Sequence, residues 1–234
     1  MSSFHLTTAS IPGREHARLF RNNQDAVAGR VEGGVAVAVV TDGCGSGASS
    51  EVGARLGARF LAQTVPALAQ EVGVGPLLAE RAVEALLKWV SEVVRPFEGP
   101  GLAALVGEQW LFTVLCAVMD QKSALIFGIG DGVWSADGVG QVLDAGEHNA
   151  PDYVAYRLVL PGVVGVPVVH FCGEARELAI ATDGLSGVAF LASFGADELV
   201  WRNPVALQRK LRVLSDRDRL LHDDTTVALL KRSA

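Results

Sequence analysis

Aspartates stand at the ends of several apolar stretches of this sequence. Asp42 closes the stretch VAVAVVTDG, Asp183 closes ELAIATDGL, and Asp131 closes LIFGIGDG. Asp223 and Asp224 come just before an apolar stretch instead, in the segment HDDTTVALL. An apolar strand that runs into an aspartate predicts a carboxylate at the edge of the core, held in a defined position by a rigid element.

Asp25, in the segment NNQDA, adds a further carboxylate before another predicted strand. Carboxylates gathered in one place repel each other and lose hydration, so a cluster of them requires a cation. Oxygen-only ligand sets favour hard cations such as Mg²⁺, Mn²⁺ or Ca²⁺. Each Asp-Gly pair taken alone is more typical of a turn, and we interpret Asp137-Gly138 as one. The repeated T-D-G segments and the D-D-T-T segment together favour a carboxylate metal site.

The first half of the chain must supply strands and two helices that position these carboxylates. Residues 25–40 predict two strands joined at Gly33-Gly34, a pair that tolerates the positive φ of a hairpin turn. A helix is expected over about 51–70, capped by Ser49 or Ser50, with Val52, Leu56, Phe60 and Val65 on its apolar face. A second amphipathic helix is expected over 76–94, with Pro76 in its first turn.

The second half of the chain is predicted to form mainly strands. Apolar stretches separated by short turns predict consecutive strands in WLFTVLCAVMD, SALIFGIGDGVWSADG and VGQVLDAG. A strand in ELAIATDGL, a helix over about 197–215 and a last strand in TTVALLKR follow. This order indicates an α+β fold with mostly antiparallel strands and helices packed on the sheet faces. Without a linker, repeat or low-complexity tract, residues 1–234 are expected to form one domain.

Composition excludes several classes of protein. Half of the 234 residues are apolar and 20% are charged, which is typical of a folded globular chain and not of a disordered one. The formal net charge is −6 and the Lys and Arg residues are scattered, which argues against nucleic-acid binding.

The cysteine pattern and the lack of long apolar runs bear on where the protein is located. Cys44, Cys116 and Cys172 are odd in number and widely spaced, which supports neither a disulfide framework nor a zinc ribbon and indicates a reducing, cytosolic environment. The sequence shows no secretory signal and no apolar run of the length that a membrane span needs. We therefore expect a cytoplasmic protein with no membrane partner.

Four motifs resemble, in order, those of bacterial type 2C protein phosphatases, which are metal-dependent Ser/Thr phosphatases. NNQDAVAGRVEGGVAVAVVTDGCGSG is similar to their N-E-D element and the strand ending in A-D-G-M-G-G. The later motifs are GIGDGVWSADG, LAIATDGLSG and HDDTTVALL, so that the resemblance spans about residues 25–230. EHARLFRNNQDA is similar to a subgroup in which a His precedes N-Q-D-A.

The resemblance implies a two-sheet antiparallel β-sandwich flanked by helices, in α-β-β-α layers, with two Mn²⁺ or Mg²⁺ ions at one end. Asp42 is implied as the carboxylate that bridges both ions, and Gly43 as a carbonyl ligand beside it. Asp183 and Asp223 are implied as the remaining ligands of the first ion. Asp131 is similar to the aspartate that helps to hold a third, weaker ion in bacterial members. Asp25 is implied to contact metal-bound water.

Some positions depart from the family pattern. Gln24 stands where many members have Glu, which is expected to weaken the second metal. Cys44 stands where eukaryotic members use a His as a candidate general acid. Strict alignment puts Phe20 at the position of the phosphate-binding Arg, so Arg21 or Arg18 is expected to serve in its place.

The implied activity is hydrolysis of phosphoserine and phosphothreonine in proteins through a water activated by the bridging metals. The expected partner is a phosphoprotein substrate of a Ser/Thr kinase, and we expect a monomer. One alternative is a pseudophosphatase that serves as a phosphoprotein sensor or scaffold. Gln24, which is expected to weaken metal binding, and the displacement of the phosphate-binding Arg favour this alternative. Another is a small-molecule phosphatase with the same fold. His16 could orient the N-Q-D turn or contact phosphate, and the two roles stay open.

Overall fold

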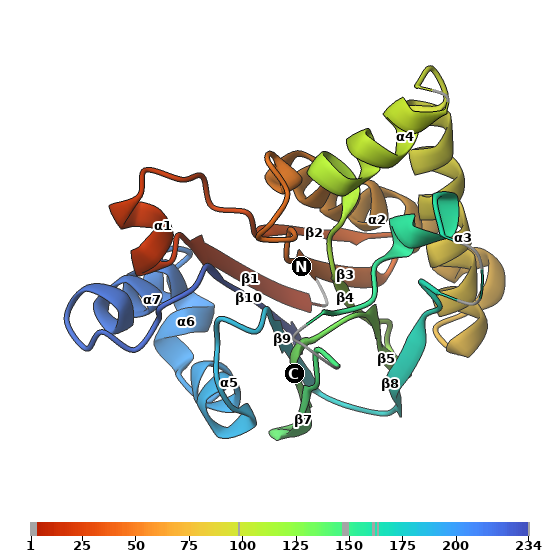
Figure 1. Cartoon of the computed structure of the whole chain (residues 1–234). Coiled ribbons are helices and arrows are strands. Elements are labelled where there is room, and N and C mark those ends of the chain that lie inside the picture. The colour runs from red at the N-terminus through yellow and green to blue at the C-terminus, as the bar shows by residue number, and fades with distance from the viewer. Residues whose placement is uncertain (1–3, 98, 147–149, 161, 163, 234) are drawn as a thin grey trace.

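The computed structural model describes residues 4–97, 99–146, 150–160, 162 and 164–233. Two five-stranded sheets stack on each other in this structure, and every strand pair within them is antiparallel (Figure 1). Sheet A has the order β1-β10-β9-β6-β7, with strands β1 (Phe4–Ile11), β10 (Thr225–Arg232), β9 (Glu177–Ala181), β6 (Gly132–Ala136) and β7 (Val139–Leu143). Sheet B has the order β2-β3-β4-β5-β8, with strands β2 (Ala26–Glu32), β3 (Val35–Thr41), β4 (Val114–Met119), β5 (Ala124–Ile129) and β8 (Val168–Gly173).

Apolar side chains on alternate positions of the strands build the layers. On β3, Ala36, Ala38 and Val40 face sheet A and form one apolar cluster with residues of β9 and β10. Val37 and Val39 point the opposite way and pack against helices on the outer face of sheet B. The predicted α-β-β-α sandwich is confirmed, and the fold is α+β.

Two long helices, α2 (Ser50–Val72) and α3 (Pro76–Val94), cover the outer face of sheet B (Figure 1). Both were predicted, but the buried face of α2 matches the expected one only in part: Val65 is buried and Phe60 packs against the core, as expected. Val52 and Leu56 are 40% and 39% exposed, while the small residues Ala54 and Ala58 are fully buried. Small side chains let this helix approach the sheet closely, so bulky apolar residues were a poor guide to its buried face. Ser49 is the residue before the helix, but its side chain makes no capping hydrogen bond.

Three shorter helices cover the outer face of sheet A: α5 (Val188–Gly195), α6 (Glu198–Arg202) and α7 (Ala206–Asp216). The single helix predicted over 197–215 is therefore wrong. The chain leaves the helical conformation at Asn203, which lies directly before Pro204, and proline disfavours helical backbone in the preceding residue. Helix α5 was not predicted.

The remaining elements are short. They are α1 (Arg14–Arg18), α4 (Pro100–Leu105), a π-helical turn (Val106–Trp110) and a 3₁₀ turn (Val154–Leu158). Both predicted hairpins are present, because β2 pairs with β3 and β6 pairs with β7. Their turn residues Gly33, Gly34, Asp137 and Gly138 all have positive φ. Strands β1 and β8 were not predicted. No helix in the described part of the chain is long and apolar enough to cross a membrane.

Candidate metal centre

A cavity of about 320 Å³ opens at one end of the sandwich. Aspartates dominate its lining, and no Lys or Arg is among the described residues that line it. The lining residues are His16, Gln24, Asp42, Gly43, Cys44, Gly45, Ser46, Thr113, Asp131, Pro151, Tyr153, Asp183, Asp223 and Asp224. The cavity thus gathers the predicted ligands Asp42, Gly43, Asp131, Asp183 and Asp223 in one place.

Strand register explains why aspartates far apart in the sequence meet here. Ala26 pairs with Thr41 between β2 and β3, so the preceding Asp25 and the following Asp42 lie at the same sheet end. Ala181 of β9 pairs with Val227 of β10 and with Val133 of β6, which brings the loops that follow β9 and precede β10 and β6 together. Asp183, Asp223, Asp224 and Asp131 belong to these three loops.

Asp42 occupies the centre of this arrangement. Its backbone N–H donates to Thr113 Oγ1 at 3.2 Å, and its carbonyl accepts from the Thr113 N–H at 2.8 Å. Burial raises the pKa of Asp42 well above its ordinary value, and the charges of Asp25, Asp183 and Asp131 raise it further. Without a cation, this position disfavours a carboxylate charge.

Gly43 follows Asp42 in a tightly packed turn. It forms an isolated bridge with Phe112, and its N–H donates to the carbonyl of Gln24 at 3.2 Å. A Cβ at this position would lie 2.7 Å from Ser50 Oγ and 2.9 Å from the Gln24 carbonyl oxygen. The close approach requires a glycine and fixes the backbone beside Asp42.

Asp25 lies behind the cavity and is 3% exposed. Its Oδ2 accepts a hydrogen bond from Thr182 Oγ1 at 2.7 Å, while Oδ1 is buried and has no hydrogen-bond partner within the described chain. Burial raises the pKa of Asp25 to about 8, and the charge of Asp224 adds to that rise. A buried carboxylate oxygen without a partner is the kind of atom that a bound cation or its water would satisfy.

Asp131 and Asp183 complete the cluster. Burial, followed by the charge of Asp183, raises the pKa of Asp131 to about 6. Burial also raises the pKa of Asp183, with a further contribution from the charge of Asp223. Gly130 and Gly132 have φ of +88° and +135°, which lets the chain turn sharply on both sides of Asp131.

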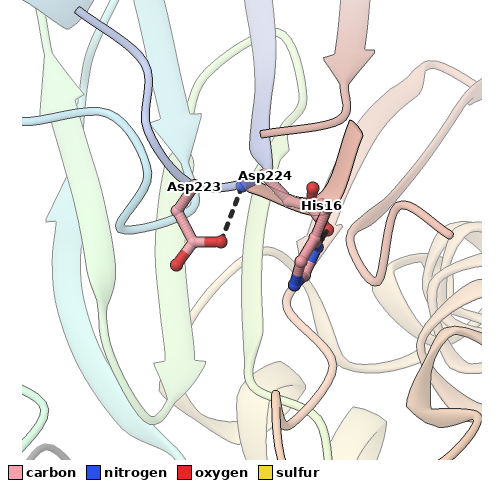
Figure 2. A group of neighbouring side chains, drawn as sticks. All are labelled: His16, Asp223 and Asp224. Atoms are coloured by element: carbon pink, nitrogen blue, oxygen red, sulfur yellow. Dashed lines mark hydrogen bonds and ion pairs between the residues drawn. The ribbon is translucent and has the colours of Figure 1, made fainter. Parts of the chain in front are cut away.

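Asp223 and Asp224 point in different directions (Figure 2). Asp223 is exposed to the cavity, and its Oδ1 accepts the N–H of Asp224 at 2.8 Å. Asp224 is 3% exposed and binds the N-terminal segment. Its Oδ1 accepts the Gly13 N–H at 2.6 Å, and its Oδ2 accepts the Gln24 N–H at 2.6 Å and His16 Nδ1 at 2.8 Å.

Gln24 supports the loop beside the cavity. Its Nε2 donates to Ser50 Oγ at 2.7 Å, and to the carbonyl oxygens of Gly47 and Cys44 at 3.3 and 3.4 Å. Its Oε1 is buried without a partner in the described chain. The side chain therefore orders the turn that carries Gly43 and Cys44, and retains one oxygen that could serve a cation. Its predicted effect on the second metal stays a prediction.

The two predicted phosphate-binding arginines lie outside the aspartate cavity. Arg21 is exposed and lines a neighbouring cavity of about 330 Å³, which shares Gln24, Gly45 and Ser46 with the first. Arg18 is exposed in α1 and lines neither cavity. Phe20 is 97% exposed and has a φ of +55°. The roles predicted for Arg18 and Arg21 stay predictions.

Sequence reasoning did not assign Thr113 or Tyr153 to the site. Burial acts to raise the pKa of the Cys44 thiol, but interactions with Ser46, Tyr153 and backbone groups outweigh it and lower that pKa from its usual value. The Ser46 hydroxyl lies 3.1 Å from Cys44 Sγ. Tyr153 sits in the irregular segment after β7, and Thr113 precedes β4. Neither position carries a local motif, so only the folded chain shows that they line the cavity.

The residues present fit hard divalent cations. Carboxylate and carbonyl oxygens converge on one cavity, where burial and then the neighbouring carboxylates raise the pKa values of the aspartates. Buried oxygens of Asp25 and Gln24 have no hydrogen-bond partner among the described residues. Such oxygen ligands suit Mg²⁺ or Mn²⁺ better than zinc. Ligand atoms of His16, Asp223 and Asp224 also lie within 4.8 Å of one another. Both oxygens of Asp224 already accept hydrogen bonds, so it is a poor ligand.

Comparison with known proteins gives a family match. A family model described as protein phosphatase 2C matches residues 12–223. No curated protein matches the chain.

Solved structures share the fold at low identity. The catalytic domain of serine threonine protein phosphatase PstP in complex with 2 manganese ions is 14% identical, with 99% of each chain covered and a TM-score of 0.63. PppA of Pseudomonas aeruginosa, described as a key regulatory component of T6SS, is 17% identical, with 99% of each chain covered and a TM-score of 0.60. Serine/threonine phosphatase Stp1 from Staphylococcus aureus is 12% identical, covers 98% of this chain and 95% of its own, and has a TM-score of 0.55.

Proposed function

The chain belongs to the protein phosphatase 2C family of metal-dependent serine/threonine phosphatases, and we propose that the aspartate cavity is its active site. One observation carries this proposal: aspartates from separate loops of both sheets line one cavity without a Lys or Arg among the described lining residues. Nothing in the comparisons supports the pseudophosphatase alternative.

Asp42, the Gly43 carbonyl, Asp183 and Asp223 would hold two Mn²⁺ or Mg²⁺ ions, and Asp131 would contribute to a third. The manganese ions of the PstP complex support this choice of metal. When bound, the ions lower the pKa of a coordinated water and neutralise charge on the phosphoryl oxygens. Asp25 would influence the metal centre from behind Asp42 through its charge and through hydrogen bonding. Its carboxylate is held in place by Thr182, whose Oγ1 donates to Asp25 Oδ2 at 2.7 Å.

The substrate would be a phosphoserine or phosphothreonine side chain of a protein that a Ser/Thr kinase phosphorylates. Arg21, in the adjoining cavity, would reach the phosphoryl oxygens more readily than Arg18, because its cavity shares Gln24, Gly45 and Ser46 with the metal centre. The family match over residues 12–223 supports a single catalytic domain. A monomeric state and a cytosolic location complete this proposal.

Hydrolysis of p-nitrophenyl phosphate tests the function directly. The reaction is measured with Mn²⁺, with Mg²⁺ and with EDTA, on the native protein, on Asp42→Ala and on the matched control Asp218→Ala. We expect metal-dependent turnover that falls at least about 100-fold in Asp42→Ala, because the shared ligand is lost. Asp218 is exposed and lies outside the cavity, so its variant should match the native protein.

Phosphoserine and phosphothreonine peptides then test the substrate class. Turnover of these peptides with release of inorganic phosphate supports a protein phosphatase. Absence of turnover with every metal, on protein shown to be folded by circular dichroism, would overturn the assignment of the cavity as an active site. Equal activity of Asp42→Ala and the native protein would overturn the assigned ligand.

A further inference from the structure

His16 is the one imidazole among the described residues that line the aspartate cavity. Its Nδ1 lies 2.8 Å from Asp224 Oδ2, and its side chain is 14% exposed. The second ring nitrogen points away from Asp224 (Figure 2). A carboxylate offers only acceptors, so Nδ1 carries a hydrogen and Nε2 is the nitrogen left for proton exchange.

Asp224 fixes the orientation of the His16 ring. The carboxylate is itself bound by the backbone N–H groups of Gly13 and Gln24, both at 2.6 Å. Gly13 has no room for a side chain, because a Cβ there would lie 2.3 Å from the carbonyl carbon of Asp223. A histidine oriented by a fixed carboxylate is an arrangement that supports proton transfer at the opposite ring nitrogen.

The proposed reaction needs a proton donor at this place. Cleavage of a phosphoserine ester leaves an alkoxide, which departs poorly unless it is protonated as the bond breaks. In the proposed function Asp42, Asp131, Asp183 and Asp223 would serve as cation ligands, and Asp224 already accepts three N–H groups. Burial together with contact to Cys44 raises the pKa of Tyr153. His16 is the one lining side chain among the described residues whose ring is fixed by a carboxylate at Nδ1, which leaves Nε2 to carry a proton to the substrate.

We propose that His16 is a catalytic residue that protonates the leaving oxygen of the substrate, with Asp224 as its positioning residue. In this step, which rests on the proposed phosphatase function, the phosphorus–oxygen bond to serine breaks. The leaving oxygen takes the proton from His16 Nε2 and becomes the serine hydroxyl. The proton released by the attacking water returns to the imidazole through solvent, so the ring ends as it began.

Substrates with different leaving groups test this role. p-Nitrophenolate is a stable anion that needs no proton donor, whereas the serine alkoxide of a phosphopeptide does. In His16→Asn, the amide nitrogen takes the place of Nδ1 and keeps a donor for Asp224, but Nε2 is lost. We expect kcat on a phosphoserine peptide with Mn²⁺ to fall about 100-fold, and kcat on p-nitrophenyl phosphate to change less than about threefold.

The matched control is His222→Asn. His222 is exposed, adjoins the same strand start and is absent from the cavity lining, so both substrates should be hydrolysed at the native rate. As a second variant, His16→Ala opens space for free imidazole. Added imidazole should restore hydrolysis of the phosphopeptide selectively, which a structural role for His16 would not produce.

Several outcomes would overturn the proposal. Equal losses on both substrates would assign His16 to binding or structure, and no loss on either would exclude it from catalysis. Weaker Mn²⁺ binding to His16→Asn in calorimetry would make it a metal ligand instead. Lack of metal-dependent turnover of p-nitrophenyl phosphate by the native protein is a different result, because it would overturn the phosphatase function itself.

Discussion

Asp223 and Asp224 are neighbours in the chain with opposite surroundings. Asp224 is buried and accepts three N–H groups, so its charge is used to anchor the N-terminal segment. Asp223 is exposed to the cavity and remains available for a cation. Sequence reasoning chose Asp223 as the ligand through its resemblance to a family motif. The motif could not show that Asp224 also orients His16, because that contact joins residues 208 positions apart.

The buried carboxyl of Asp25 predicts how stability depends on pH without metal. Its pKa rises from 3.8 to about 8 in the folded protein, chiefly through burial. Between these values the folded state holds a proton that the unfolded chain has released. The free energy of unfolding should therefore fall as the pH rises through this window, by up to about 1.4 kcal/mol per pH unit for one such group.

Urea denaturation in EDTA at about pH 6 and about pH 8 measures this effect. The native protein should be more stable at the lower pH, and Asp25→Asn should weaken that dependence because the amide does not titrate. Asp218→Asn, at an exposed position, serves as the control and should leave it unchanged. A native protein that is more stable at the higher pH in EDTA would contradict the prediction. Raised pKa values at Asp42, Asp131 and Asp183 act in the same direction.

Among the elements, helix α2 depends on glycine for its contact with the segment before β4. A Cβ at Gly53 would lie 2.1 Å from the carbonyl oxygen of Gln109 and 3.0 Å from Trp110 Cα. Both neighbouring atoms belong to the backbone, so they cannot move away by a change of side-chain rotamer. The segment continues into Phe112, which bridges Gly43 of the site. Close packing of α2 therefore helps to place the metal centre.

Gly53→Ala should destabilise the protein by about 1–3 kcal/mol, because the added methyl group forces α2 away from this backbone. Alanine has the higher helix propensity, so a gain would be expected if propensity decided the outcome. Gly101→Ala is the matched control: Gly101 lies in α4 with no atom within 4 Å of a Cβ, and its variant should gain up to about 1 kcal/mol. Urea denaturation distinguishes the two, and equal or higher stability of Gly53→Ala would contradict the argument.

The sequence predicted elements well where one face is clearly apolar. Helix α3 has the predicted bounds, and β3, β4 and β5 are strands buried along their whole length. The prediction failed where the pattern is weak. Strand β8 is an edge strand without a buried residue, and more than half of the buried residues of α2 are glycine or alanine. Packing between residues far apart in the sequence determines the position of β8 and the buried face of α2. A local pattern of hydrophobicity therefore does not predict either of them.

At the scale of the whole molecule, the metal centre joins the two sheets. Asp42 follows β3 of sheet B, whereas Asp183 follows β9 and Asp223 precedes β10 of sheet A. Burial is the main cause of the raised pKa values of Asp42 and Asp183, and the like charges of neighbouring aspartates raise them further. Without a cation these loops therefore repel one another. A cation would convert this repulsion into attraction across the end of the sandwich.

Manganese should therefore raise the stability of both sheets together. A ligand at about 100 times its Kd that binds only the folded state adds about 2.7 kcal/mol, which corresponds to roughly 5–10 °C in Tm for a chain of this size. Hydrogen exchange should slow together at residues 41–43 and 181–184, because the ligands come from both sheets. Asp42→Asn should remove this increment while raising the Tm in EDTA, since it deletes one of the repelling charges. Protection of one sheet end alone would show that the ions do not bridge the sheets.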